Sequence, residues 1–143
     1  MADLDQHYYN LKSQKSVNER QQTSTQSEID SIDSKIERLR RVYNNIDAAK
    51  ESIKNIKKAN NKLPNSYKNV WKGNNADTIF GICDGGNLQQ DYKNYIDSID
   101  SVEDAINREI CSLKSMRSQK YGILQGLINA WNTLSTEIRN YFN

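Results

Sequence analysis

The best candidates for catalytic chemistry are a single histidine, His7, and two cysteines, Cys83 and Cys111. A general base or a metal ligand needs partner groups around it, and His7 has none nearby in the N-terminal segment. Cys83 precedes Asp84-Gly85-Gly86, which suggests a nucleophile at a turn, but no histidine or other obvious base lies near it in the chain. We therefore predict that the chain is not an enzyme and that His7 is exposed to solvent.

Motifs for cofactors and metals are also missing. Gly85-Gly86 lacks the G-x-x-x-x-G-K-[ST] spacing of a phosphate-binding loop. The acidic residues that follow do not have the spacing of a calcium-binding EF-hand loop, and a solvated helix face explains them better. These acids are Asp91, Asp97, Asp100, Glu103 and Asp104. Two cysteines are too few for a disulfide framework, so free thiols are favoured over a disulfide. We expect no cofactor and no metal.

The composition favours an elongated helical protein over a compact globule. Of the 143 residues, only 36% are hydrophobic, 27% are charged and one is proline. A globule of this length needs many apolar side chains, whereas two packed helices need only a stripe along each. Disorder is the competing interpretation of such a polar chain. The regular spacing of the apolar residues argues against it.

Net charge and hydropathy disfavour two classes of partner. A net charge of +2 is too small to predict binding to nucleic acid or to an anionic membrane. No stretch approaches the roughly 20 apolar residues of a membrane span, so integral membrane contact is not expected. The N-terminal sequence MADLDQHYYN has acids where a secretory signal has basic residues, and no apolar run follows it. We expect a cytoplasmic protein; if it leaves the cell, it does so without a general secretory signal.

A row of apolar residues predicts the first helix, because its members are three and four positions apart in turn. The row contains Ile29, Ile32, Ile36, Leu39, Tyr43 and Ile46. Extended backward, it reaches Leu11, Tyr8 and Leu4 only through polar residues at positions 15, 18, 22 and 25. The N-terminal third is therefore expected to be weakly held. After Ile46 the row is predicted to slip by one position, through Ala49, Ile53, Ile56 and Leu63.

The centre of the chain carries turn signals. Pro64 disfavours helix at Leu63, an Asn/Gly cluster follows, and a second break comes at residues 84–87. A second long row predicts the last helix. Its members are Leu88, Tyr92, Tyr95, Ile99, Val102, Ile106, Ile110, Leu113, Tyr121, Leu124, Ile128, Trp131, Leu134 and Ile138.

The predicted fold is all-α, a long antiparallel two-helix hairpin of coiled-coil type in one domain, residues 1–143. The first arm covers about 4–63, the turn 64–75, a short helix 76–83 and the second arm about 88–141. Charge supports this pairing. Residues 35–72 contain eleven basic and three acidic residues, a net of +8, and residues 77–110 contain two basic and eight acidic, a net of −6. Folding the chain back near Gly73 sets the basic segment beside the acidic one.

The sequence at the predicted turn resembles a known motif. Trp71, Gly73, Ala76 and Phe80 resemble the Trp-x-Gly turn of the WxG family, the small helical-hairpin proteins of type VII (ESX) secretion systems. Glycine can adopt the positive φ that reverses a chain, and a tryptophan there covers the ends of both helices. The chain is longer than a typical member. It is most similar to the YwqH-like companions of LXG polymorphic toxins.

The resemblance implies a helical protein that binds another helical protein. Substrates of that secretion system carry a Tyr-x-x-x-Asp/Glu signal on the second helix or its tail, and here the one match, Tyr43 with Asp47, lies on the first helix. This departure favours a partner or chaperone of an exported toxin over an independently exported protein. The resemblance thus implies a cytoplasmic protein, or one that a type VII system exports together with its partner and without a cleaved signal peptide. The implied partner is the N-terminal helical domain of a toxin, a fellow small helical protein or a second copy.

The second arm carries the predicted partner interface. Its C-terminal part is more apolar than the N-terminal segment that faces it in a hairpin, and an apolar face opposite a Gln/Ser/Thr-rich arm is available to a partner. The residues are Tyr121, Leu124, Ile128, Trp131 and Ile138. Two other functions compete: a coiled-coil scaffold or oligomerisation module unrelated to secretion, and a membrane-surface or nucleic-acid binder that uses the basic residues 35–72.

Overall fold

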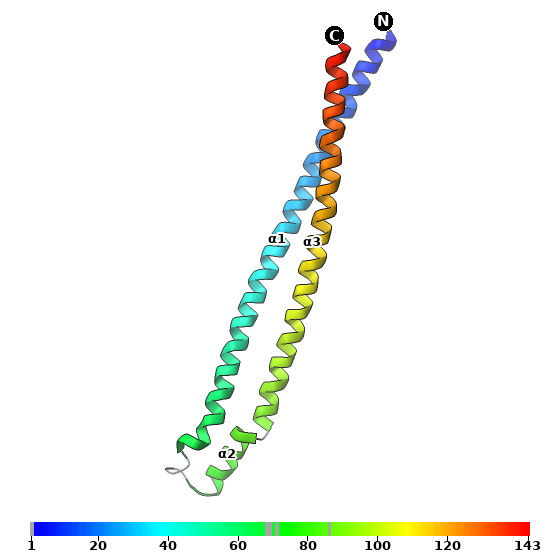
Figure 1. The fold of residues 1–143 in the computed structure, drawn as a ribbon. Coiled ribbons are helices and arrows are strands. Elements are labelled where there is room, and N and C mark those ends of the chain that lie inside the picture. The colour runs from blue at the N-terminus through cyan, green and yellow to red at the C-terminus, as the bar shows by residue number, and fades with distance from the viewer. Residues whose placement is uncertain (1, 68–69, 71, 86) are drawn as a thin grey trace. The chain divides into compact units, whose positions relative to one another are not determined.

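The structure is a computed structural model, and it describes residues 2–67, 70, 72–85 and 87–143. Within these residues the regular structure is helical and no strand occurs: α1 spans Ala2–Tyr67, α2 spans Asn74–Gly85 and α3 spans Asn87–Tyr141 (Figure 1). The two long helices pack against each other. The all-α, hairpin-like fold predicted from the sequence is confirmed.

The helices form two compact units. Unit 1 consists of residues 1–37 and 110–143, and unit 2 of residues 38–109. Within each unit a segment of α1 lies beside a segment of α3 (Figure 1). The core of unit 1 comes from both helices, and its aliphatic side chains are Leu11, Ile29, Ile32, Ile36, Ile110 and Leu113. Burying each such side chain contributes about 1.5–3 kcal/mol, so these residues stabilise the pairing of α1 with α3 in unit 1.

Contacts between the helices show that they are antiparallel in each unit. In unit 1 the ring of Tyr8 stacks on that of Tyr141 at 5.4 Å, whereas Asp33, further along α1, pairs with Arg117, earlier in α3. In unit 2, Lys50 pairs with Asp100 and Asn60 with Tyr92. As the residue number rises along α1, the number of the contacting residue on α3 falls, as expected for an antiparallel hairpin.

The row of packed residues on α1 keeps one register, which corrects the predicted slip after Ile46. Lys50, Ile53 and Lys57 continue the three-four spacing and are half-buried, whereas Ala49 and Ile56 are exposed, Ile56 to 51%. The prediction followed the apolar residues. The helix instead keeps its rotation and places two lysines at packing positions, where their aliphatic stems can be covered while the ammonium groups reach outward.

The predicted row on α3 was also wrong at two positions, where the neighbouring residue takes part in the packing instead. Tyr95 and Val102 are 58% and 48% exposed, while the adjoining Ile96 is half-buried and Glu103 is buried. One position along a helix is a rotation of about 100°, so a shift by one residue moves a side chain off the packed face. In unit 2 the buried position therefore holds a carboxylate, which Lys50 neutralises.

The connection between the arms is shorter than the predicted turn of residues 64–75. Helix α1 continues through Pro64 to Tyr67, and α2 begins at Asn74. A proline removes one backbone hydrogen bond and crowds the carbonyl four residues earlier, and α1 ends within one turn after it. Gly73, just before α2, has a φ of 118°, a backbone conformation that residues other than glycine rarely adopt.

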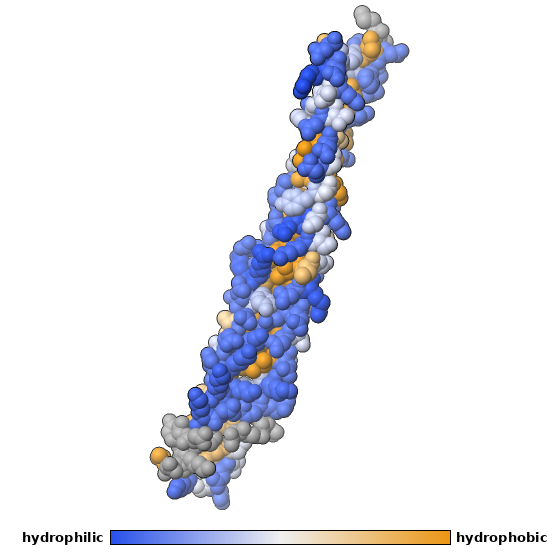
Figure 2. All heavy atoms as spheres, viewed as in Figure 1, coloured by the Kyte–Doolittle hydropathy of each residue, from blue (hydrophilic) through white to orange (hydrophobic). Residues whose placement is uncertain are grey.

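Hydrophobic residues appear on the visible surface only in separate patches among hydrophilic ones (Figure 2). This distribution agrees with a hydrophobic content of 36%, which suffices for a row along each helix.

Candidate partner-binding surface

The predicted turn motif lies at the start of α2, next to Gly73. The backbone N–H of Asp77 donates to the carbonyl oxygen of Gly73 at 3.0 Å, which begins the helix. Ala76 is fully buried and Phe80, one turn later, is half-buried, so both lie on the covered face of α2 with Cys83. Trp71 lies outside the described residues, and the role of the four residues as a family motif stays a prediction.

In unit 1, polar side chains of α1 hold the segment predicted to be weakly held. Asn18 is 6% exposed, and its Nδ2 donates to the backbone carbonyl of Leu127 on α3 at 2.9 Å. Its Oδ1 accepts a hydrogen bond of 2.6 Å from Gln22, and Thr25, one heptad after Asn18, is also buried. Buried polar groups are tolerated when their hydrogen bonds are made, so polar side chains fill the packing positions between the buried Leu11 and Ile29.

Trp131, a predicted interface residue, contacts two side chains of α1. Its indole Nε1 donates to Oε1 of Glu19 at 2.9 Å, and the ammonium of Lys15 lies 4.5 Å from the ring centroid. The ring is half-buried. Two ion pairs also join the helices of unit 1, Asp33 with Arg117 at 2.9 Å and Glu28 with Lys120 at 2.6 Å.

A groove of about 510 Å³ lies between α1 and α3 in unit 1. Leu124 and Ile128 contribute its apolar side from α3. The α1 side is polar and consists of Gln22, Thr23, Gln26, Ser27 and Asp30. We call this groove the polar-walled groove. Its lining joins two predicted interface residues to amide, hydroxyl and carboxylate groups, the combination that a helix with one apolar side chain and polar flanks can fill.

The five predicted interface residues differ in how much surface they leave open. Their steps of three, four or seven along α3 place them on one side of the helix. Tyr121 is 48% exposed; Leu124, Ile128, Trp131 and Ile138 are half-buried. Because Trp131 is held by Glu19 and Lys15, the open part of this side is centred on Tyr121, Leu124 and Ile128.

Unit 2 contains a charged cluster in addition to its buried apolar residues Ala76, Cys83 and Ile106. The ammonium of Lys50 lies 2.9 Å from Oδ1 of Asp100 and 3.1 Å from Oε1 of Glu103, and its side chain is 14% exposed. The hydrogen bond to Asp100, followed by the carboxylate of Glu103, raises the pKa of Lys50. A hydrogen bond to Glu103 also raises the pKa of Tyr43. Lys50 and Tyr43 are therefore anchored to α3 through two acids.

The groups considered for chemistry are not assembled into a site. His7 is exposed, and Cys83 and Cys111 are free thiols, the first buried and the second exposed. Among the described residues no group of three His, Cys, Asp or Glu side chains is placed to hold a metal ion. Across the same residues, no helix combines the length and the apolar character needed to cross a bilayer.

A comparison with protein families decides what kind of chain this is. A family model described as YwqH-like matches residues 13–139. The chain belongs to the YwqH-like family. The match includes most of α1 and α3 and all of α2, so the resemblance inferred from the turn and the paired arms is confirmed at the level of this YwqH-like family. No match was found among curated proteins or among solved structures.

Sequence reasoning predicted a polar arm of α1 opposite the apolar residues of α3, but not the groove that the two line together. Gln22 interrupts the apolar row of α1, and Gln26 follows one turn later, opposite the apolar α3 residues Leu124 and Ile128. The signal was present, because polar residues at packing positions of one arm and apolar residues in the other predict an incompletely covered interface. Met116 and Ile123 lie on another side of α3 and are 45% and 51% exposed. The sequence pattern did not predict that these two residues would be exposed.

Proposed function

We propose that this YwqH-like protein is a non-enzymatic adaptor or chaperone that binds the helical N-terminal domain of a type VII secretion substrate, an LXG-type toxin. The observation that carries the proposal is the polar-walled groove, whose apolar side consists of Leu124 and Ile128, together with the exposed Tyr121 on the same side of α3. Membership in the YwqH-like family supports the class of partner.

The composition of the groove suits a helix of another protein. A partner helix can place an apolar residue against Leu124 and Ile128 while its polar flanks bond to Gln22 and Gln26. Tyr121, nearly half exposed, is an aromatic anchor of the kind that contributes most to such interfaces.

Export with the partner is part of the proposal. The only Tyr-x-x-x-Asp pair of the expected type, Tyr43 and Asp47, is half-buried in unit 2. Tyr43 interacts with Glu103, and Asp47 lies 3.7 Å from the ammonium of Lys50. Because both residues are engaged in the fold, we infer that the toxin supplies the export signal and that this protein leaves the cell, if at all, as its companion.

Co-expression with an LXG-type toxin tests the function. The helical N-terminal domain of that toxin is tagged, and the eluted complex is separated by size-exclusion chromatography. We expect co-elution of the wild-type chain and a loss of most of it for the variant Ile128→Ala, because truncating a central interface residue costs on the order of 1–3 kcal/mol.

The matched control is Ile123→Ala, which removes the same atoms from a different side of α3, where Ile123 is 51% exposed. Circular dichroism establishes that each variant is folded. Failure of the wild-type chain to co-elute with the toxin domain would refute the toxin-binding function. Equal co-elution of both variants would place the interface elsewhere on the chain.

Oligomerisation is a second candidate function, because each unit has exposed apolar residues seven positions apart on α3. These are Tyr95 with Val102 in unit 2 and Met116 with Ile123 in unit 1. Spacing of seven residues is typical of a coiled-coil seam. Sedimentation of the chain alone distinguishes this candidate, since an oligomerisation module forms a stable multimer without the toxin.

A further inference from the structure

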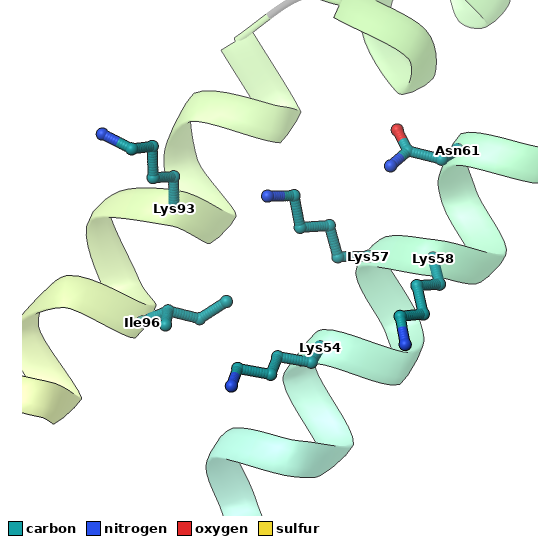
Figure 3. A pocket seen from close by; sticks show the side chains of 6 residues that line it. All are labelled: Lys54, Lys57, Lys58, Asn61, Lys93 and Ile96. Atoms are coloured by element: carbon teal, nitrogen blue, oxygen red, sulfur yellow. The ribbon is translucent and has the colours of Figure 1, made fainter.

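A second groove, in unit 2, is bordered by lysines (Figure 3). It has a volume of about 420 Å³ and is lined by Lys54, Lys57, Lys58 and Asn61 of α1 and by Lys93 and Ile96 of α3. We call it the lysine groove. Lys54 and Lys57 extend from α1 toward α3, and Ile96 extends from α3 toward α1 (Figure 3). The space between the helices is thus bounded by aliphatic stems and one isoleucine.

The positive charge of the lysine groove is only partly balanced. Lys54 lies 3.6 Å from Glu51 and Lys93 lies 3.8 Å from Asp97, both at long ion-pair distances and at exposed positions. Among the described residues, no ion pair involves Lys57 or Lys58. The like-charged pair Lys54 and Lys58, four positions apart on α1, is itself unfavourable.

Lys50, two turns earlier on α1, provides an internal comparison. It occupies the same helix position as Lys57, one heptad before it, and α3 supplies Asp100 and Glu103 at 2.9 and 3.1 Å. At Lys57, α3 supplies Ile96 and another lysine, Lys93. Both lysines occupy packing positions of α1. Carboxylates of α3 neutralise Lys50, whereas the described residues of α3 supply no carboxylate to Lys57.

We propose that the lysine groove binds an acidic amphipathic helix of a protein partner. An apolar side chain of that helix packs against Ile96 and the lysine stems, and its flanking Asp or Glu side chains pair with the ammonium groups at the rim. The carboxylates also relieve the repulsion between Lys54 and Lys58. This is a second docking surface, in a different unit from the polar-walled groove.

The chemistry of the lining favours protein over nucleic acid. Of the described residues that line the groove, none is an arginine, whose planar fork matches phosphate, and none is aromatic, on which a base can stack. A phosphate backbone also has no apolar group for the floor that Ile96 and the lysine stems provide.

Fluorescence anisotropy with synthetic helices tests the proposal on the full chain. The probe is a labelled peptide of roughly 21 residues, about six helical turns, with Leu at three-four spacing and Glu on both flanks. Two control peptides replace the Glu by Lys or the Leu by Ser, and a DNA duplex of equal charge serves as the polyanion. We expect the Glu/Leu peptide to bind more tightly than all three and to lose affinity with added salt.

Variants locate the binding. Lys58→Glu/Lys93→Glu reverses two exposed charges at the groove, and we expect the affinity for the Glu/Leu peptide to fall about tenfold or more. The matched control, Lys35→Glu/Lys114→Glu, makes the same charge change at exposed positions of unit 1 and is expected to change the affinity less than about twofold.

Four results would overturn the proposal: no binding of the Glu/Leu peptide, equal loss in both double variants, duplex DNA binding as tightly as the Glu/Leu peptide, or wild-type self-association that the Lys58→Glu/Lys93→Glu variant abolishes. The last result makes a second copy the occupant. The toxin-binding function is tested separately, by co-elution with the Ile128→Ala variant. Failure of the Glu/Leu peptide to bind therefore does not refute the toxin-binding function, and failure to bind the toxin domain does not refute the lysine groove as a binding site.

Discussion

The indole Nε1 of Trp131 donates a hydrogen bond of 2.9 Å to Oε1 of Glu19, which joins α3 to α1 within unit 1. Trp131 thus has an intramolecular partner, although its apolar surroundings on α3 indicated a contact with another protein. Because Lys15 also lies over the ring, the tryptophan supports the polar-walled groove and leaves Leu124 and Ile128 as its apolar floor.

Replacing Trp131 with Phe keeps an aromatic ring and removes the hydrogen bond to Glu19. We expect a loss of about 1 kcal/mol in the free energy of unfolding, since the bond is charge-assisted but partly exposed to water. Urea unfolding followed by circular dichroism measures it. The variant Glu19→Gln keeps an acceptor and the intact ring, and it is expected to lose less. A Trp131→Phe protein as stable as the wild type would show that the hydrogen bond does not contribute.

Replacing Asn18 with Ala removes the side chain that donates to the carbonyl of Leu127. We expect a loss of roughly 1–2 kcal/mol in the free energy of unfolding, because a buried hydrogen bond and the packing of a 6% exposed residue both disappear. Asn10→Ala, at an exposed position of α1, is the control. If both variants unfold at the same urea concentration, Asn18 does not stabilise the N-terminal segment.

Replacing Lys50 with Met leaves Glu103 buried at 5% exposure without its counter-ion. We expect a clear fall in the melting temperature, because an unpaired buried carboxylate is unfavourable. The double variant Lys50→Met/Glu103→Met replaces the pair by apolar side chains and is expected to recover much of the loss. Thermal unfolding of the three proteins decides whether the pair acts as a unit; no recovery would argue against it.

Stability is expected to decrease in alkaline solution. The folded state raises the pKa of Lys50 through Asp100 and Glu103, that of Tyr43 through Glu103, and that of Tyr141 through burial. For each group the folded state binds its proton more tightly. The stabilisation is complete below the unfolded pKa values of about 10 and is lost as the pH rises through the folded ones.

Urea unfolding at a series of pH values from roughly 8 to 11.5 measures this decrease. The variant Tyr43→Phe removes one of the three groups, so its stability is expected to depend less steeply on pH above about 10. A wild-type stability that stays constant or rises over that range would contradict the assignment.

The fold was predictable because its signals are repetitive. Ile29, Ile32 and Ile36 set the register of α1, and a dozen similar residues on α3 reinforce one another, so the helices and their antiparallel pairing followed from spacing and charge. The register in unit 2 was missed at Ile56 and Tyr95. There the chain places Lys50, Lys57 and Glu103 at packing positions, and a prediction based on hydrophobicity moves to the nearest apolar neighbour.

The candidate site was predictable only in outline. The apolar residues Leu124 and Ile128 were identified, because they face a polar segment of α1. The two grooves were not, since a groove depends on which side chains of two separate helices meet. The lysine groove arises where Lys57 meets Ile96 and Lys93 instead of an acid, a pairing that depends on the register of α1 against α3.

Isothermal titration of the toxin's N-terminal helical domain into the full chain tests the central claim most directly. For Ile128→Ala we expect the dissociation constant to rise about tenfold or more above that of the wild type, and for Ile123→Ala to stay within about twofold of it. Equal dissociation constants for the two variants would contradict the polar-walled groove as the toxin-binding surface, and no heat of binding with the wild-type chain would contradict the adaptor function itself.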